Sequence, residues 1–97
     1  MAKYYLTNKA VNDLSEIWYY TIETWSEMQA EKYYDLLVAS CDHLANNPGI
    51  GRKYDMVSKG LLGFKSGEHI IFYSIISKNE IQVTRILHGM MDLKSKL

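Results

Sequence analysis

Residues Glu80 to Asp92 read Glu-Ile-Gln-Val-Thr-Arg-Ile-Leu-His-Gly-Met-Met-Asp. Ile81, Val83 and Leu87 fall on one parity of this stretch, and polar side chains hold most of the other. Such alternation is typical of a β-strand that buries one face. Gly89 ends the pattern, so we expect a last strand that stops just before a Met-Met-Asp tail.

Two residues break the alternation, because Arg85 stands on the apolar parity and Ile86 on the polar one. A guanidinium on a buried face is costly unless it is paired or its charged end reaches water. One interpretation is therefore structural: Arg85 forms an ion pair, with Asp92 or Glu80 as candidate partners, and His88 caps backbone carbonyls. The other interpretation is functional, with an arginine and an imidazole placed side by side at the end of the sheet.

The composition predicts one globular domain, residues 1–97. Hydrophobic residues make up 47% of the chain, and 11 lysines and arginines balance 11 aspartates and glutamates. A neutral total does not favour a non-specific nucleic-acid binder, which is normally basic. A single cysteine, Cys41, allows no internal disulfide. Neither a signal segment nor a membrane-length apolar run is evident, so we expect a cytoplasmic protein with no contact to the membrane.

The first half of the chain predicts a strand followed by two helices. Tyr4-Tyr5-Leu6 is the strand candidate, and Thr7 or Asn8 caps the first helix. The second helix starts at the capping box Ser26-Glu27-Met28-Gln29 and ends at Asn46-Asn47-Pro48-Gly49. Two apolar stripes run along these helices: Val11, Leu14, Ile17, Trp18, Ile22 and Trp25 on the first, and Ala30, Tyr33, Leu37, Cys41 and Leu44 on the second. Both tryptophans are expected in the core, and the short connection predicts a tight helical hairpin.

The second half predicts a three-stranded meander. We expect a polar loop from Ile50 to Gly60, a strand from Leu61 to Lys65, and a nearly continuous apolar central strand from His69 to Ile76. Lys78-Asn79 then makes a two-residue turn, with Asn79 accepting a positive φ. The fold class is α+β, with the helical hairpin packed on one face of a small antiparallel sheet. The other face is expected to stay partly open and to hold any site.

Six side chains could carry chemistry on that sheet: Arg52, Lys53, Lys65, His69, Arg85 and His88. A small ribonuclease needs an acid or base near neutral pH and cations for its transition state. Histidine and arginine could supply both. No metal site is expected, because the three histidines are scattered and Cys41 sits on a helix stripe. No cofactor motif is present.

The order of several short motifs resembles the ParE-like toxins of the RelE/ParE superfamily of bacterial toxin–antitoxin modules. The motifs are Ala10-x-x-Asp13-Leu14-x-x-Ile17, Trp25-Ser26, Ala30-x-x-Tyr33, Leu44-x-x-x-Pro48, Gly51-Arg52, His69-x-Ile71-Phe72-Tyr73 and Arg85-Ile86-Leu87-His88. This resemblance covers nearly the whole chain. It implies a helical hairpin on a small antiparallel sheet, and the toxin of a type II system that inhibits DNA gyrase without bond chemistry of its own.

The resemblance also implies partners. These are gyrase as the target and a ParD-like antitoxin with a ribbon-helix-helix N-terminus, in a heterotetramer or larger assembly that touches DNA only through the antitoxin. The partner-binding residues we expect are Arg52, Lys53, His69, Arg85, His88, Met90 and Met91.

Two alternatives stay open. RelE-like members of the superfamily cut messenger RNA on the ribosome, and here His88, Arg85 and Lys65 would be the catalytic set. Ile70, however, stands where such nucleases often carry an arginine. The second alternative is a degenerate binding module without toxicity.

Overall fold

The computed structural model describes residues 1–90 and residue 97. Its elements are β1 (Lys3–Leu6), α1 (Asn8–Thr24), α2 (Glu27–Asn46), the 3-10 turn η1 (Pro48–Ile50), β2 (Arg52–Lys53), β3 (Leu62–Ser66), β4 (His69–Ser77) and β5 (Glu80–His88). Thr7 and Ser26 cap the two helices as expected: their hydroxyls accept hydrogen bonds from Ala10 N and Gln29 N, each at 3.1 Å.

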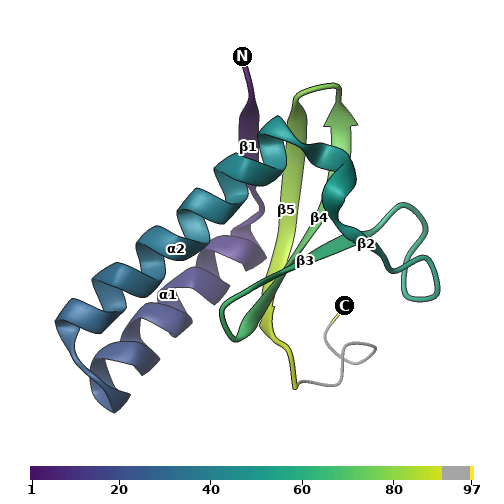
Figure 1. Cartoon of the computed structure of the whole chain (residues 1–97). Coiled ribbons are helices and arrows are strands. Elements are labelled where there is room, and N and C mark those ends of the chain that lie inside the picture. Colours follow the sequence, from purple (N-terminus) through teal and green to yellow (C-terminus); the bar gives the residue numbers. More distant parts are fainter. Residues whose placement is uncertain (91–96) are drawn as a thin grey trace.

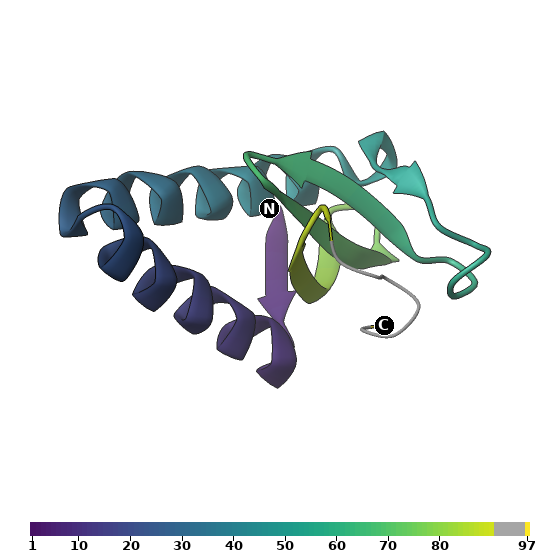
Figure 2. The same cartoon turned by 90° about the horizontal axis from the view of Figure 1, so that it is seen from below.

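The five strands form one mixed sheet in the order β1-β5-β4-β3-β2. The pairs from β2 to β5 are antiparallel, and β1 runs parallel to β5. The helical hairpin packs on one face, and its closed end extends past the sheet (Figure 1). Seen from below, the two helices meet at their connection and diverge toward the sheet (Figure 2). The predicted α+β architecture is confirmed, with β2 as an addition inside the expected Ile50–Gly60 loop.

Side chains bury both faces of this sheet. The larger core joins the helices to the sheet through Ala10, Leu37, Leu44, Ile71, Tyr73, Ile81, Val83 and Ile86. A smaller cluster of Leu61, Phe72 and Leu87 lies on the other face, covered by Tyr54 and Val57 of the β2–β3 loop. The expectation of a partly open second face with the site on it is therefore wrong, because this loop folds back over it.

A β-bulge explains the broken parity of the last strand. Phe72 pairs with Arg85, but the next residue, Tyr73, pairs with Val83, so Thr84 is the extra residue on β5. A bulge of this kind reverses which face the following side chains occupy. Ile86 thus joins Ile81 and Val83 in the main core, and the alternation is regular on each side of the bulge.

The start of α1 completes the edge of β5 where β1 ends. Thr7 N donates to Val83 O (3.1 Å), and the Thr7 hydroxyl donates to Thr84 O (2.8 Å). Six residues further, the Asp13 carboxylate accepts Ile86 N at 2.9 Å. Backbone groups that are buried without a partner are costly, so these contacts stabilise the outer edge of the strand.

Three local predictions are wrong. Trp25 is 73% exposed, because the closed end of the hairpin extends beyond the sheet (Figure 1). Val11 is 46% exposed, because it faces outward from the first helix. Trp18 is half-buried against the Tyr34 ring. Among the described residues only Gly60 and Gly67 have a positive φ, so Asn79 does not adopt one. The expected two-residue connection of Lys78 and Asn79 is present, because Ser77 pairs with Glu80, and the register shift before it makes Ile76 an extra residue on β4.

Tyr73→Phe should lower the free energy of unfolding by about 1–3 kcal/mol, the cost of leaving buried polar groups unpaired. Tyr73 is fully buried. Its hydroxyl donates a hydrogen bond to Pro48 O (2.7 Å) and accepts one from the Gly51 backbone N–H (2.9 Å). Urea denaturation measures the change. Tyr5→Phe is the control, since Tyr5 is 45% exposed and its hydroxyl donates to Glu80 at the protein surface. Equal stability of the two variants would mean that Tyr73 does not anchor the chain after α2.

Candidate functional site

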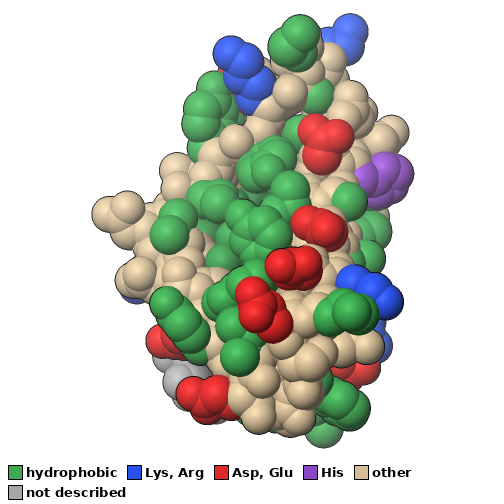
Figure 3. Space-filling view, turned by 90° about the vertical axis from the view of Figure 1, so that its left-hand side faces the viewer, with side chains coloured by type: hydrophobic (Ala, Val, Ile, Leu, Met, Phe, Trp, Pro, Cys, Tyr) green, Lys and Arg blue, Asp and Glu red, His purple; other side chains and the backbone are tan. Residues whose placement is uncertain are grey.

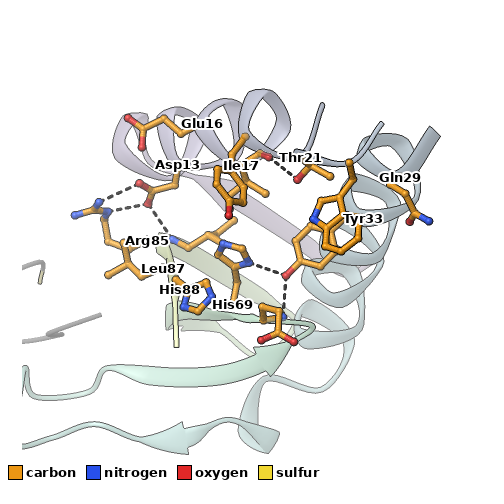
Figure 4. A pocket seen from close by; sticks show the side chains of 14 residues that line it. Asp13, Glu16, Ile17, Thr21, Gln29, Tyr33, His69, Arg85, Leu87 and His88 are labelled. Carbon is orange, nitrogen blue, oxygen red and sulfur yellow. Dashed lines mark hydrogen bonds and ion pairs between the residues drawn. The ribbon is translucent and has the colours of Figure 1, made fainter. Parts of the chain in front are cut away.

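A cleft of about 840 Å³ lies between the underside of the hairpin and the end of the sheet. Its walls come from α1, α2, the β3–β4 turn and the end of β5 (Figure 4). The lining residues are Asp13, Glu16, Ile17, Tyr20, Thr21, Trp25, Gln29, Tyr33, Glu68, His69, Arg85, Ile86, Leu87 and His88. The cleft is therefore on the helix side of the sheet, and exposed Trp25 contributes to it from the closed end of the hairpin.

Two histidines face each other in this cleft. His69 and His88 are directly paired residues of β4 and β5, and their ring centroids are 5.4 Å apart at an interplanar angle of 76°. His88 Nδ1 accepts the Met90 backbone N–H at 3.1 Å. An acceptor at Nδ1 places the proton of a neutral imidazole on Nε2. The antiparallel register therefore brings together two residues that lie 19 positions apart in the sequence (88 − 69).

Tyr33 of α2 fixes the orientation of His69. Its hydroxyl lies 2.6 Å from His69 Nδ1 and accepts the Glu68 backbone N–H at 2.9 Å (Figure 4). The other acceptor within reach, Ser66 O, is 3.4 Å away, so the shorter contact favours donation of the hydroxyl proton to Nδ1. This single hydroxyl connects the middle of the hairpin to the β3–β4 turn.

Arg85 of β5 pairs with the Asp13 carboxylate on α1. Arg85 Nε and Nη2 lie 2.8 and 2.9 Å from the two carboxylate oxygens, a bidentate geometry. The hydrogen bond to Asp13 raises the pKa of Arg85, which stays charged. The expected structural ion pair of Arg85 is present. The partner that the structure shows is Asp13 and not Glu80. Asp92, the other expected partner, lies outside the described residues.

Burial and the neighbouring His88 lower the pKa of His69, against the opposing influence of Glu68 and Asp13. Near and below pH 6.5, the ordinary pKa of histidine, His69 therefore binds a proton more readily in the unfolded chain than in the folded protein. Stability should be full above that pH and fall as the pH drops below it. Urea denaturation at pH 7.5 and pH 5 should show the loss, and His69→Gln should reduce it. His43→Gln, on the exposed side of α2, is the control; identical pH profiles for His69→Gln and the wild type would contradict the assignment.

The structure separates the other candidate residues from this cleft. Arg52 and Lys53 are exposed on β2, three strands away from β5 in the sheet. Lys65 alternates with Phe64 and Ser66, which point to the helices, so it lies on the opposite face. Met90 is 87% exposed outside the lining, and Met91 lies outside the described residues.

Tyr33 and Asp13 hydrogen-bond the predicted residues His69 and Arg85, but neither of them was predicted to have a functional role. Tyr33 was assigned to an apolar stripe, and nothing local indicates that its hydroxyl meets Glu68 in a turn 35 residues away. Asp13 did have a signal, because a guanidinium on a buried parity requires a carboxylate. Only the tertiary fold selects Asp13 from the acidic residues of the chain.

The described residues hold no group of three or more metal-binding side chains of histidine, cysteine, aspartate or glutamate. Burial raises the pKa of the Cys41 thiol to about 12, so this cysteine stays protonated in the core. No helix in the described part of the chain has the length and apolarity required to cross a membrane.

Comparison with known proteins agrees with the motifs and the fold. A model of the ParE toxin of type II toxin–antitoxin systems, parDE, matches residues 4–93. The chain belongs to the ParE toxin family. It is 36% identical over 96 residues to the toxin ParE1 of Mycobacterium tuberculosis (strain CDC 1551 / Oshkosh), covering 99% of this chain and 98% of that protein.

Two further relatives extend the comparison. A toxin ParE1 of Caulobacter vibrioides is 31% identical over 97 residues, covering 100% of this chain and 99% of that protein. A solved structure described as the chromosomal ParDE TA system from P. aeruginosa superposes with a TM-score of 0.76 at 23% identity, covering 91% of this chain and 96% of that one. The solved structure supports the ParE-like fold. The resemblance to the ParE-like toxins is confirmed.

Proposed function

We propose that this ParE-family toxin inhibits DNA gyrase by binding and holds the enzyme on its cleaved DNA, without bond chemistry of its own. Membership of the toxin family of a type II system supports the general role. The positions of Arg85 and Lys65, the two cationic residues of the alternative catalytic set, favour binding over nuclease chemistry. Arg85 is held in a bidentate pair by Asp13, and Lys65 lies on the other face of the sheet.

The charge of the cleft supports the same conclusion. Three carboxylates, of Asp13, Glu16 and Glu68, share the lining with the single guanidinium of Arg85. Cleavage of RNA needs cationic groups directed at the charge that develops on phosphorus, and carboxylates oppose that charge. His69 and His88 could exchange protons in such a cleft, but with this lining they suit contacts to a protein partner better.

We further propose that a ParD-like antitoxin neutralises the toxin by inserting a segment into this cleft. The lining is aromatic and imidazole-rich, with Tyr20, Trp25, Tyr33, His69 and His88 around an apolar floor. Aromatic and apolar grooves suit an amphipathic segment that folds on binding. The antitoxin's N-terminal ribbon-helix-helix dimer would then join two toxins in a cytoplasmic heterotetramer or larger assembly.

Controlled expression in bacteria tests this function. Induction of the toxin alone should arrest growth and produce chromosomal double-strand breaks, measurable by pulsed-field gel electrophoresis. Co-expression of a ribbon-helix-helix protein from the neighbouring gene should restore growth. Growth arrest with intact chromosomes would contradict the gyrase target, and unimpaired growth would indicate a non-toxic module.

A further inference from the structure

A second, smaller pocket of about 450 Å³ opens between the two helices and shares no lining residue with the cleft. Its walls are Trp18 of α1 and Glu31, Tyr34 and Asp35 of α2. The Trp18 and Tyr34 rings meet edge to face, with centroids 6.0 Å apart. A view onto the hairpin shows apolar side chains along it and acidic side chains along one flank (Figure 3). Aromatic rings and carboxylates therefore meet in one place.

The two acidic residues of this pocket, Glu31 and Asp35, do not stabilise each other. Glu31 and Asp35 stand one turn apart on α2, and Glu27 stands one turn before them. Like charges at this spacing repel, and aspartate is a poor helix former in a helix interior. Within residues 1–90 and residue 97, neither Glu31 nor Asp35 has an ion pair. A cation from outside the chain would relieve this repulsion.

We propose that this pocket binds an arginine side chain of the antitoxin. The planar guanidinium can stack on an aromatic ring and at the same time donate to carboxylates, which a lysine ammonium does less well. Trp18 and Tyr34 supply the rings, and Glu31 and Asp35 supply the acceptors. This assignment rests on the proposed function, in which an antitoxin binds the toxin. It adds the identity of one antitoxin side chain at the interface.

The position of the pocket favours the antitoxin as the source of the arginine. Tyr33 lines the cleft and the next residue, Tyr34, lines the pocket, so the two sites lie on different sides of α2. A helix is only about 10–12 Å across. Trp25 extends the cleft to the closed end of the hairpin. A segment that follows the cleft past Trp25 and turns around this end would reach the pocket, and a disordered segment can wrap in this way.

The chemistry of the pocket can be tested on the toxin alone. N-acetyl-arginine amide, titrated into isotopically labelled toxin, should shift the NMR signal of the Trp18 indole N–H more than that of Trp25, the other tryptophan. The neutral isostere N-acetyl-citrulline amide should cause little shift. Glu31→Gln with Asp35→Asn should weaken the arginine effect at least about fivefold, through the lost charge attraction. Equal responses to both amides, or equal shifts of both tryptophans, would overturn the proposal.

The source of the arginine is tested with the complete complex. The product of the adjacent antitoxin gene should bind Glu31→Gln/Asp35→Asn toxin at least about fivefold more weakly than the wild type, by the same loss of charge attraction. Asp42→Asn, an exposed carboxylate on the same helix outside the pocket, should bind normally. Unchanged affinity of the double variant, together with a positive arginine titration, would exclude the antitoxin as the occupant. Neither measurement involves gyrase, so a wrong target would leave both results standing.

Discussion

Asp13→Ala is expected to lower the free energy of unfolding by about 2–4 kcal/mol, since breaking a largely buried charge pair by removing one partner is strongly destabilising. Asp13 is only 9% exposed in its side chain and Arg85 20% exposed. The same carboxylate also accepts the Ile86 backbone N–H, so the substitution removes two hydrogen bonds of the guanidinium and one of the strand edge. The 20% exposure of Arg85 keeps the expected loss below that of a fully buried pair.

Urea denaturation of three variants separates these contributions. Glu16→Ala, exposed on the same helix, should change the free energy of unfolding by less than about 0.5 kcal/mol, as ordinary surface substitutions do. Asp13→Asn keeps an acceptor for Ile86 N but removes the charge, so its loss should be smaller than that of Asp13→Ala. If Asp13→Ala and Glu16→Ala lowered the free energy of unfolding equally little, the Asp13–Arg85 pair would not be the contact that holds β5 to α1.

Leu37→Ala should cost about 2–5 kcal/mol, the range of large-to-small changes in a close-packed core. Leu37 is fully buried in the cluster that joins the hairpin to the sheet. Thermal and urea unfolding measure the loss, and Leu36→Ala is a matched control, because this neighbour removes the same atoms from a side chain that is 44% exposed. Equal losses for the two leucines would mean that α2 does not bury the face assigned here.

Most of the architecture could be predicted because its signals are local. The capping residues Thr7 and Ser26, the stripe through Leu37 and the proline after α2 each act within a few residues. Burial of individual side chains on the hairpin was less predictable. Trp25 fits the helical period as well as Leu14 does, but only the extent of the sheet determines which of them has a partner to pack against.

The candidate site was predictable only in part because it depends on register and on long-range contacts. The sequence indicated His69 and His88 separately, and the β4–β5 pairing brings their rings together. The bulge at Thr84 has no local signal other than the broken alternation itself, which is equally consistent with a functional arginine. Tyr33 and Asp13 come from the helices, and their roles appear only when the hairpin lies on the sheet.

The proposed gyrase target is tested most directly with purified components. Toxin, gyrase, ATP and supercoiled plasmid should yield linear DNA after detergent and protease treatment, while ribosomes programmed with messenger RNA should show no new cleavage with the same toxin preparation. His88→Ala toxin serves as the comparison in both reactions. Messenger RNA cut in the ribosomal A site, with the cutting lost in His88→Ala and no trapped plasmid breaks, would contradict the proposed function and assign the cleft to a ribonuclease.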